Sequence, residues 1–230
     1  VVAEAFGELI QDGSPELAGA MVAAGHRISP QVFADFNRGI LDTSLPMDVK
    51  ASAAGSLYIV DAVRYGPIIH RWLVSEDPEE REAGIIAAGV SRDARFVDLL
   101  KGMINTSDDA TLLLILESLR KISVGGLNPL VVGRLWDPDP RMRRAALELY
   151  RIIDEASLKN VISMLGDEDA RIAELARMKI RTAGYQNSLR LVKSLSLPQR
   201  KLREALFDLL GDMAIKDLDV FRFVRDQART

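Results

Sequence analysis

Residues 137–150 have the sequence DPDPRMRRAALELY, which contains both a helix start and the apolar face of that helix. Asp139 can cap the helix, because its carboxylate can accept from a backbone N–H that has no partner in the first turn. Pro140 suits the next position, where its missing N–H is no loss. The apolar residues recur at the spacing of one helix face: Met142, Ala145, Ala146 and Leu149. The stretch therefore predicts an amphipathic α-helix that begins near Pro140.

An aliphatic anchor, a short polar turn and a new helix recur along the whole chain. Successive anchors are 31, 32, 31, 31, 30 and 30 residues apart: Ile10, Leu41, Leu73, Ile104, Leu135, Leu165 and Leu195. Capping residues stand four places after five of the anchors: Ser14, Asp77, Asp108, Asp139 and Asp169. Ten places after five of them stands a small residue that would allow close helix approach: Ala20, Ala51, Ala83, Ala145 and Ala205. We therefore predict that each repeat is a helix, a tight turn and a second helix.

One helix is expected to be longer than the others, and a glycine pair is expected to link two helices. The repeat at Leu41 has Leu45 in place of a capping residue, and its second helix is expected to run on toward Tyr65. Gly125 and Gly126 are interpreted as a link between helices. No stretch alternates in the manner of a strand followed by a hairpin turn, so the fold class is all-α.

Three stretches resemble HEAT-like repeats of the short variety, about thirty residues long, first noted in phycobilisome lyases. They are residues 137–150, GDEDARIAELA at 166–176 and EDPEEREAGIIAAG at 76–89, and the resemblance extends over nearly the whole chain. It implies a right-handed α-solenoid of about seven two-helix repeats, forming a single domain over residues 1–230. The family contains scaffolds, adaptors and a few enzymes, so the motif indicates fold much more strongly than function.

Composition excludes several classes of function. The chain has no cysteine and only two histidines, His26 and His70, which removes thiolate metal sites, disulfides and three-histidine sites. The longest uncharged apolar run, residues 51–60, is about half of what a membrane-spanning helix needs. We expect a soluble cytoplasmic domain. The absence of an initiator Met suggests a fragment of a longer protein, and that parent protein could be membrane-anchored.

Catalytic motifs are also missing from the sequence. It has no GxSxG, P-loop or GxGxxG, and none of the His-Glu pairs that HEAT-like di-iron hydroxylases carry. The paired aspartates of the turns are explained by helix capping. His26 is interpreted as a cap or surface residue and His70 as a packing residue. We therefore expect a protein that is not an enzyme and uses neither a metal nor a cofactor.

Arginines supply the first candidate binding feature. Residues 1–115 carry 9 Lys and Arg against 17 Asp and Glu, whereas residues 116–230 carry 21 against 16. Three arginines stand sixteen places after their anchors, and three more occur on the same second helices: Arg120, Arg151 and Arg181, with Arg143, Arg144 and Arg177. If they converge on the concave face, they form a cationic stripe for an acidic partner. Alternatively they pair locally, as Arg144 can with Glu148.

Leucines supply the second candidate feature. Residues 112–116 are five consecutive apolar residues, more than one buried helix face needs. Leu113 and Leu116 are expected to point away from the inter-helix core if Leu114 faces inward. Neighbouring repeats then cover them, or else Leu112, Leu113 and Leu116 form an apolar groove for a partner helix.

The favoured interpretation is a scaffold module that binds a protein partner, or neighbouring domains of the same chain, on the concave face. One alternative is a nucleic-acid-binding protein of the DNA glycosylase type, using the basic C-terminal half together with Trp72 and Trp136; the pI of about 5.6 argues against it. Another alternative is a protein like the bilin lyases. Only the repeat itself supports this alternative.

Overall fold

We analysed a computed structural model that describes residues 14–105, 107–123, 125–183, 204–205 and 208–209. Helices form throughout these residues, and no strand occurs among them. The chain divides into two compact units, residues 1–125 (unit 1) and 126–230 (unit 2). The division falls between Gly125 and Gly126, the pair that the sequence marks as a link. The all-α class is confirmed for the described residues.

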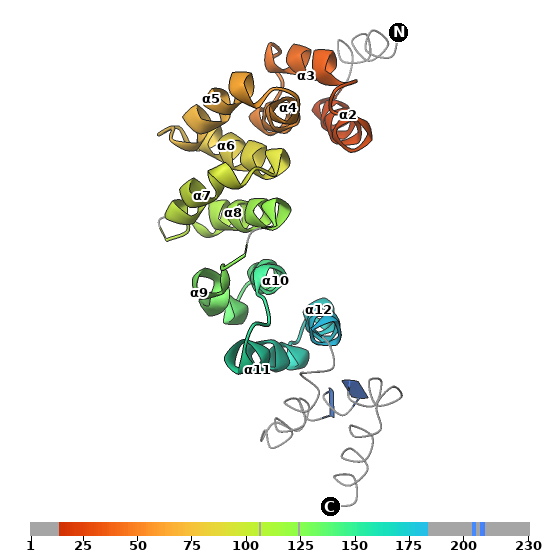
Figure 1. The fold of residues 1–230 in the computed structure, drawn as a ribbon, viewed down its shortest axis with the longest axis vertical. Coiled ribbons are helices and arrows are strands. Elements are labelled where there is room, and N and C mark those ends of the chain that lie inside the picture. The colour runs from red at the N-terminus through yellow and green to blue at the C-terminus, as the bar shows by residue number, and fades with distance from the viewer. Residues whose placement is uncertain (1–13, 106, 124, 184–203, 206–207, 210–230) are drawn as a thin grey trace, which may run out of the picture. The chain divides into compact units, whose positions relative to one another are not determined.

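Unit 1 is built from helices that contact their neighbours along the chain (Figure 1). They are α2 (Pro15–Ile28), α3 (Ala34–Leu41), α4 (Met47–Val60), α5 (Ala62–Leu73), α6 (Pro78–Ser91), the 3-10 helix η1 (Ala94–Phe96), α7 (Val97–Met103) and α8 (Asp109–Ile122). The helices that follow the predicted turns contact one another in sequence, α2 with α4, α4 with α6 and α6 with α8. The shorter helices α3, α5 and α7 contact α4, α6 and α8 respectively.

Unit 2 repeats this arrangement with shorter helices. They are α9 (Asn128–Val131), the 3-10 helix η2 (Val132–Trp136), α10 (Pro140–Leu149), α11 (Glu155–Ser163), the 3-10 helix η3 (Met164–Gly166) and α12 (Ala170–Thr182). Helix α10 contacts both η2 and α12, and α12 contacts both α11 and η3. Among the described residues, no helix is long and apolar enough to cross a bilayer.

The predicted caps are confirmed in five repeats. Ser14, Asp77, Asp108, Asp139 and Asp169 each occupy the N-cap of a helix and accept from a backbone N–H of its first turn. Each cap of this kind stabilises its helix by about 1 kcal/mol, because the N–H would otherwise be left without a partner. The anchor Leu195 and the turn after it lie outside the described residues.

The helix that follows the turn at Leu41 is shorter than the sequence predicts. Helix α4 ends at Val60, and the prediction that it runs on toward Tyr65 is wrong. Asp61 leaves the helical conformation, with φ −146° and ψ 86°, and its carboxylate caps α5 by accepting from Arg64 N at 3.0 Å. One residue therefore ends one helix and begins the next.

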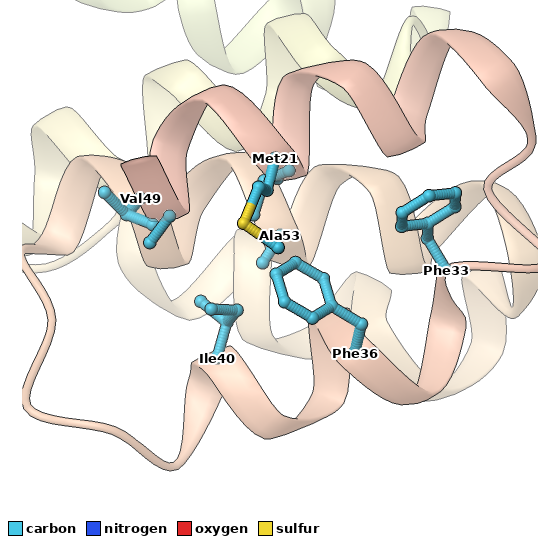
Figure 2. Close-up of a cluster of buried hydrophobic side chains, with 8 residues drawn as sticks. Met21, Phe33, Phe36, Ile40, Val49 and Ala53 are labelled. Atoms are coloured by element: carbon cyan, nitrogen blue, oxygen red, sulfur yellow. The ribbon is translucent and has the colours of Figure 1, made fainter. Parts of the chain in front are cut away.

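The core of unit 1 begins with a cluster of buried side chains between α2, α3 and α4 (Figure 2). The cluster contains Ala18, Met21, Val22, Phe33, Phe36, Ile40, Val49 and Ala53. The rings of Phe33 and Phe36 meet edge to face, with centroids 6.3 Å apart. Burying one of the larger side chains contributes about 1.5–3 kcal/mol, so this cluster accounts for the packing of the three helices.

Small residues bring the remaining helices of unit 1 close together. A Cβ atom at Gly55 of α4 would lie 2.7 Å from the carbonyl oxygen of Ala87 in α6. One at Gly89 of α6 would lie 2.6 Å from Ser118 Oγ in α8. The predicted small positions Ala51, Ala83 and Ala145 are buried, whereas Ala20 is exposed and Ala205 half-buried. Close approach was therefore predicted correctly at the three buried alanines and wrongly at Ala20.

Candidate partner-binding site

Arg143 of α10 is buried in an ion pair. Its side chain is 9% exposed and faces Asp167, whose side chain is 4% exposed. Nε and Nη2 each donate to one carboxylate oxygen of Asp167 at 2.9 Å, and this bidentate pair raises the pKa of Arg143. Nη1 donates to the carbonyl oxygens of Asp137 and Pro138. The expectation that Arg143 faces a partner is wrong, because the turn before α12 already occupies its guanidinium.

Two further arginines of the predicted stripe are paired within their own helices. Arg144 Nε lies 3.1 Å from Glu148 Oε1, the local pair that the spacing of four residues predicts. Arg177 Nε lies 3.3 Å from Glu174 Oε2, in an ion pair without hydrogen-bond geometry. Partly exposed pairs of this kind contribute about 0–1 kcal/mol, so an anionic partner can displace them at little cost.

Arg151 and Arg181 lie at neighbouring helix ends in unit 2. Arg151 directly follows the C-cap of α10, Arg181 is in the last turn of α12, and both are exposed. Lys179 of α12 joins these ends, because its Nζ donates to the carbonyl oxygens of Glu148 at 3.1 Å and Tyr150 at 2.9 Å. We call Arg151, Lys179 and Arg181 the cation edge.

Two charges of the cation edge, those of Lys179 and Arg151, affect one another. Burial lowers the pKa of Lys179, Glu148 raises it, and the positive charge of Arg151 lowers it further. Like charges held close together attract an anion, because an anion relieves their mutual repulsion. The C-terminal ends of α10 and α12 also favour cations, so these residues have a role in helix stability as well.

Arg120 stands at the corresponding place in unit 1. It is exposed in the last turn of α8. Since Arg120 and the cation edge belong to different units, the three-arginine ladder stays a prediction. Within unit 2, Arg151 and Arg181 stand at the adjoining ends of α10 and α12.

The leucines of α8 are largely covered. Leu112 and Leu116 are 0% and 1% exposed, and Leu113 and Leu114 are half-buried. The burial of Leu116 agrees with the alternative that other helices cover it, and Leu116 offers no surface for an apolar groove. Helix α8 contacts both α6 and α7, which accounts for two buried faces on one helix. Leu112 and Leu116 are core residues, and α6 of the preceding repeat and α7 of the same repeat are the helices that contact α8 among the described residues.

Described residues of unit 1 line two open cavities. The first has a volume of about 450 Å³ and lies between the turn at 73–76 and residues 103–111, with Arg81 in its wall. The second has a volume of about 370 Å³ and is lined by Tyr58, Pro67, His70, Arg95, Phe96 and Leu99, among others. Both volumes fall in the range of small-ligand sites.

A polar cluster borders the second cavity. The hydroxyl of Tyr58 donates to Asp93 Oδ2 at 2.8 Å, and Arg95 donates to both oxygens of the same carboxylate. The hydrogen bonds from Arg95, opposed in part by burial, lower the pKa of Asp93 to about 2. Burial and the Asp93 charge raise the pKa of Tyr58 to about 12. Both pKa values lie far from neutral pH, so neither group changes its charge there.

The two histidines differ in their surroundings. His26 Nδ1 lies 3.0 Å from Ser56 Oγ, and burial, then Arg92 and Lys121, lower the pKa of His26. His70 is exposed at the rim of the second cavity. No group of three or more His, Asp and Glu side chains suited to a metal ion occurs in the described part of the chain.

The two tryptophans differ in exposure. Trp72 is buried at 6% exposure, whereas Trp136 in unit 2 is 52% exposed. Base stacking requires an accessible ring, so Trp72 is unsuited to it.

Two features of the described residues follow the sequence repeat but are not among the predicted site residues. Arg81 stands eight places after Leu73, as Arg143 stands eight places after Leu135. Asp93 and Arg95 repeat the spacing of Asp139 and Arg141, which also form an ion pair across an N-cap. Comparison with protein-family models and with curated proteins gives no match to this chain.

Proposed function

We propose that the chain is an α-solenoid of HEAT-like repeats that binds a protein partner carrying acidic groups and catalyses no reaction itself. The repeat phasing supports the solenoid. Five predicted turns, at residues 41–46, 73–78, 104–109, 135–140 and 165–170, each lie between two helices, apart from Thr106, which lies outside the described residues. Contacts between successive second helices have the pattern that stacked repeats require.

The cation edge carries the proposal of an acidic partner. Two repeat-equivalent arginines stand at neighbouring helix ends, and the hydrogen bonds of Lys179 fix the two ends together. Guanidinium groups bind carboxylates through paired hydrogen bonds, and exposed arginines are common in the binding surfaces of proteins. The positions of these cations are set by helices, so a partner meets a preformed surface.

The test is affinity capture from a lysate of the source organism. The bait is the whole chain, compared with the double variant Arg151→Glu/Arg181→Glu. The matched control is Arg141→Glu/Arg171→Glu, which makes the same charge change at the other end of the same two helices, where both arginines are exposed. Circular dichroism must first show equal helix content in all three proteins.

We expect a protein partner that the native chain and the control retain and the Arg151/Arg181 variant loses. Equal retention by all three proteins, or no captured partner, would contradict the proposal. Loss of the captured material after nuclease treatment would favour the nucleic-acid alternative instead. Arg120→Glu alone, run in parallel, tests whether the ladder extends into unit 1.

A further inference from the structure

Arg81 and Arg143 make the same contact in two different repeats. Each stands eight residues after its anchor and donates from Nη1 to the carbonyl oxygen two residues after that anchor. For Arg81 the acceptor is Ser75 at 3.2 Å, and for Arg143 it is Asp137 at 3.0 Å. The two guanidinium groups are therefore held in the same way by their own turns.

The two arginines differ in the residues that the next turn along the chain supplies. Two nitrogens of Arg143, Nε and Nη2, donate to the carboxylate of Asp167. Nη2 also lies 3.4 Å from Glu168 Oε1. At the corresponding places after Ile104 the chain has Thr106 and Ser107, which carry hydroxyls instead of carboxylates. Among the described residues, no carboxylate is paired with Arg81.

The cavity of about 450 Å³ is lined by Arg81 and by residues of the turn that follows Ile104, as Arg143 faces the turn that follows Leu165. Its wall includes Ser75, Arg81, Met103, Ser107, Asp108 and Thr111. Arg81 is only partly buried. Its Nη1 donates to the carbonyl oxygen of Ser75. Nε and Nη2 are the nitrogens that bind Asp167 in the case of Arg143.

We propose that this cavity binds a carboxylate side chain of an acidic peptide, with Arg81 as its bidentate donor. The Arg143–Asp167 pair supplies the geometry, since both oxygens of one carboxylate fit one edge of a guanidinium. Leu73 and Met103 line the cavity and contact the methylene groups of the incoming side chain. The volume accommodates one acidic side chain with part of its backbone.

Acidic groups of the cavity limit the charge of the ligand. Glu76 and Asp108 both line it. The Asp108 carboxylate already accepts from Thr111 N at 2.9 Å and from Thr111 Oγ1 at 3.0 Å, as the cap of α8. Two negative charges in the wall repel a phosphate dianion more strongly than a carboxylate, so the site favours a carboxylate.

The test uses a peptide that copies the chain's own acidic turn. Acetylated, amidated Leu-Gly-Asp-Glu-Asp-Ala has the sequence of residues 165–170. It is titrated into the whole chain while the Nε–Hε NMR signal of Arg81 is followed. We expect a saturable shift with a Kd of about 1 mM. The neutral peptide Leu-Gly-Asn-Gln-Asn-Ala should bind at least about tenfold more weakly.

Variants separate the site from general charge effects. Arg81→Gln should weaken binding about tenfold or more, whereas Arg71→Gln, which removes an exposed arginine from α5, should leave it unchanged. Thr106→Asp puts a carboxylate two places after the anchor Ile104, as Asp167 stands two places after Leu165, and should block the peptide, since an attached group competes at millimolar effective concentration or more. Thr106→Asn should not block it. The Thr106 pair decides the outcome if Arg81→Gln fails to fold.

Four results would overturn the proposal: no shift up to about 20 mM peptide, equal binding of the neutral peptide, indifference to both Arg81→Gln and Thr106→Asp, or tighter binding of a phosphoserine peptide. The cavity belongs to unit 1 and the cation edge to unit 2. Either the site or the proposed function can therefore fail without the other.

Discussion

The guanidinium of Arg143 joins two turns of unit 2. Its hydrogen bonds reach the carbonyl oxygens of Asp137 and Pro138 on one side and the carboxylate of Asp167 on the other. Because both charged side chains are almost fully removed from water, each depends on the other for its stability. Removing one partner leaves a buried charge without compensation.

We expect Asp167→Asn to lower the free energy of unfolding by about 3 kcal/mol, measured by urea denaturation. Glu168→Gln is the control, since the Glu168 side chain is 88% exposed and lies 3.4 Å from the same guanidinium. Its cost should stay below about 1 kcal/mol. Similar costs for both variants would contradict the structural role given to the buried pair.

Asp93 should make stability depend on acid. Its pKa in the folded chain, about 2, is below the ordinary 3.8, because Arg95 and Tyr58 donate to the carboxylate. Its contribution of about 1–2 kcal/mol is therefore present above pH 4 and lost as the pH falls through 2. In urea denaturation, the stability difference between the native chain and Asp93→Asn should shrink from pH 7 to pH 2. A difference that stays constant would refute this assignment.

Residue identity predicts local contacts better than distant ones. Asp139 and Asp169 were predicted as caps because a capping carboxylate and the N–H that donates to it lie in one turn of chain. Arg143 was misassigned because its partner, Asp167, stands 24 residues away in sequence. Arg144 offered the same charge and has only a local partner, so charge alone does not distinguish a buried arginine from an exposed one.

At the scale of elements, helix separation in unit 1 is set by glycines. A Cβ at Gly84 of α6 would lie 2.5 Å from the backbone nitrogen of Leu73, which ends α5. A backbone atom cannot rotate away as a side chain can, so the two helices would have to separate. Gly39 of α3 has no atom within 4 Å of such a position.

Gly84→Ala should therefore lower stability by about 1–3 kcal/mol, despite the better helix propensity of alanine. Gly39→Ala should raise stability by up to about 1 kcal/mol, since only the propensity changes. Thermal unfolding of both variants measures the difference. Equal effects of the two substitutions would show that the α5–α6 contact tolerates a methyl group.

Element boundaries were predictable where a cap marks them. The end of α4 was missed because Asp61 is both the C-cap of α4 and the N-cap of α5, with no polar turn between the helices. For residues 112–116 the sequence left two alternatives open, for a related reason. A helix packed between two others buries a wide face, and this neighbourhood cannot be read from the helix's own sequence.

At the scale of the whole molecule, the division between Gly125 and Gly126 is the main feature. Gly126 has a φ of 74°, a conformation that glycine adopts without strain. We expect insertion of Gly-Ser-Gly-Ser between these two residues to change stability by less than about 1 kcal/mol, because a longer link costs little loop entropy. Urea denaturation followed by circular dichroism measures it.

The same insertion between Ala87 and Ala88, inside α6, is the control and should abolish cooperative unfolding of unit 1. A loss of several kcal/mol at the Gly125–Gly126 link would mean that the two units stabilise each other, as the prediction of a single domain over residues 1–230 requires. The insertion thus distinguishes a single domain from two independently stable units, which have the same contacts within each unit.

The order of contacts in unit 1 bears on how the chain folds during synthesis. Its main contacts join each second helix to the next one along the sequence, from α2 through α4 and α6 to α8. Short sequence separations mean little loop closure before a contact forms, and such topologies fold quickly. Each repeat can therefore pack against the preceding repeat as soon as it leaves the ribosome. The N-terminal part should become protected from hydrogen exchange on stalled nascent chains before α8 has been translated.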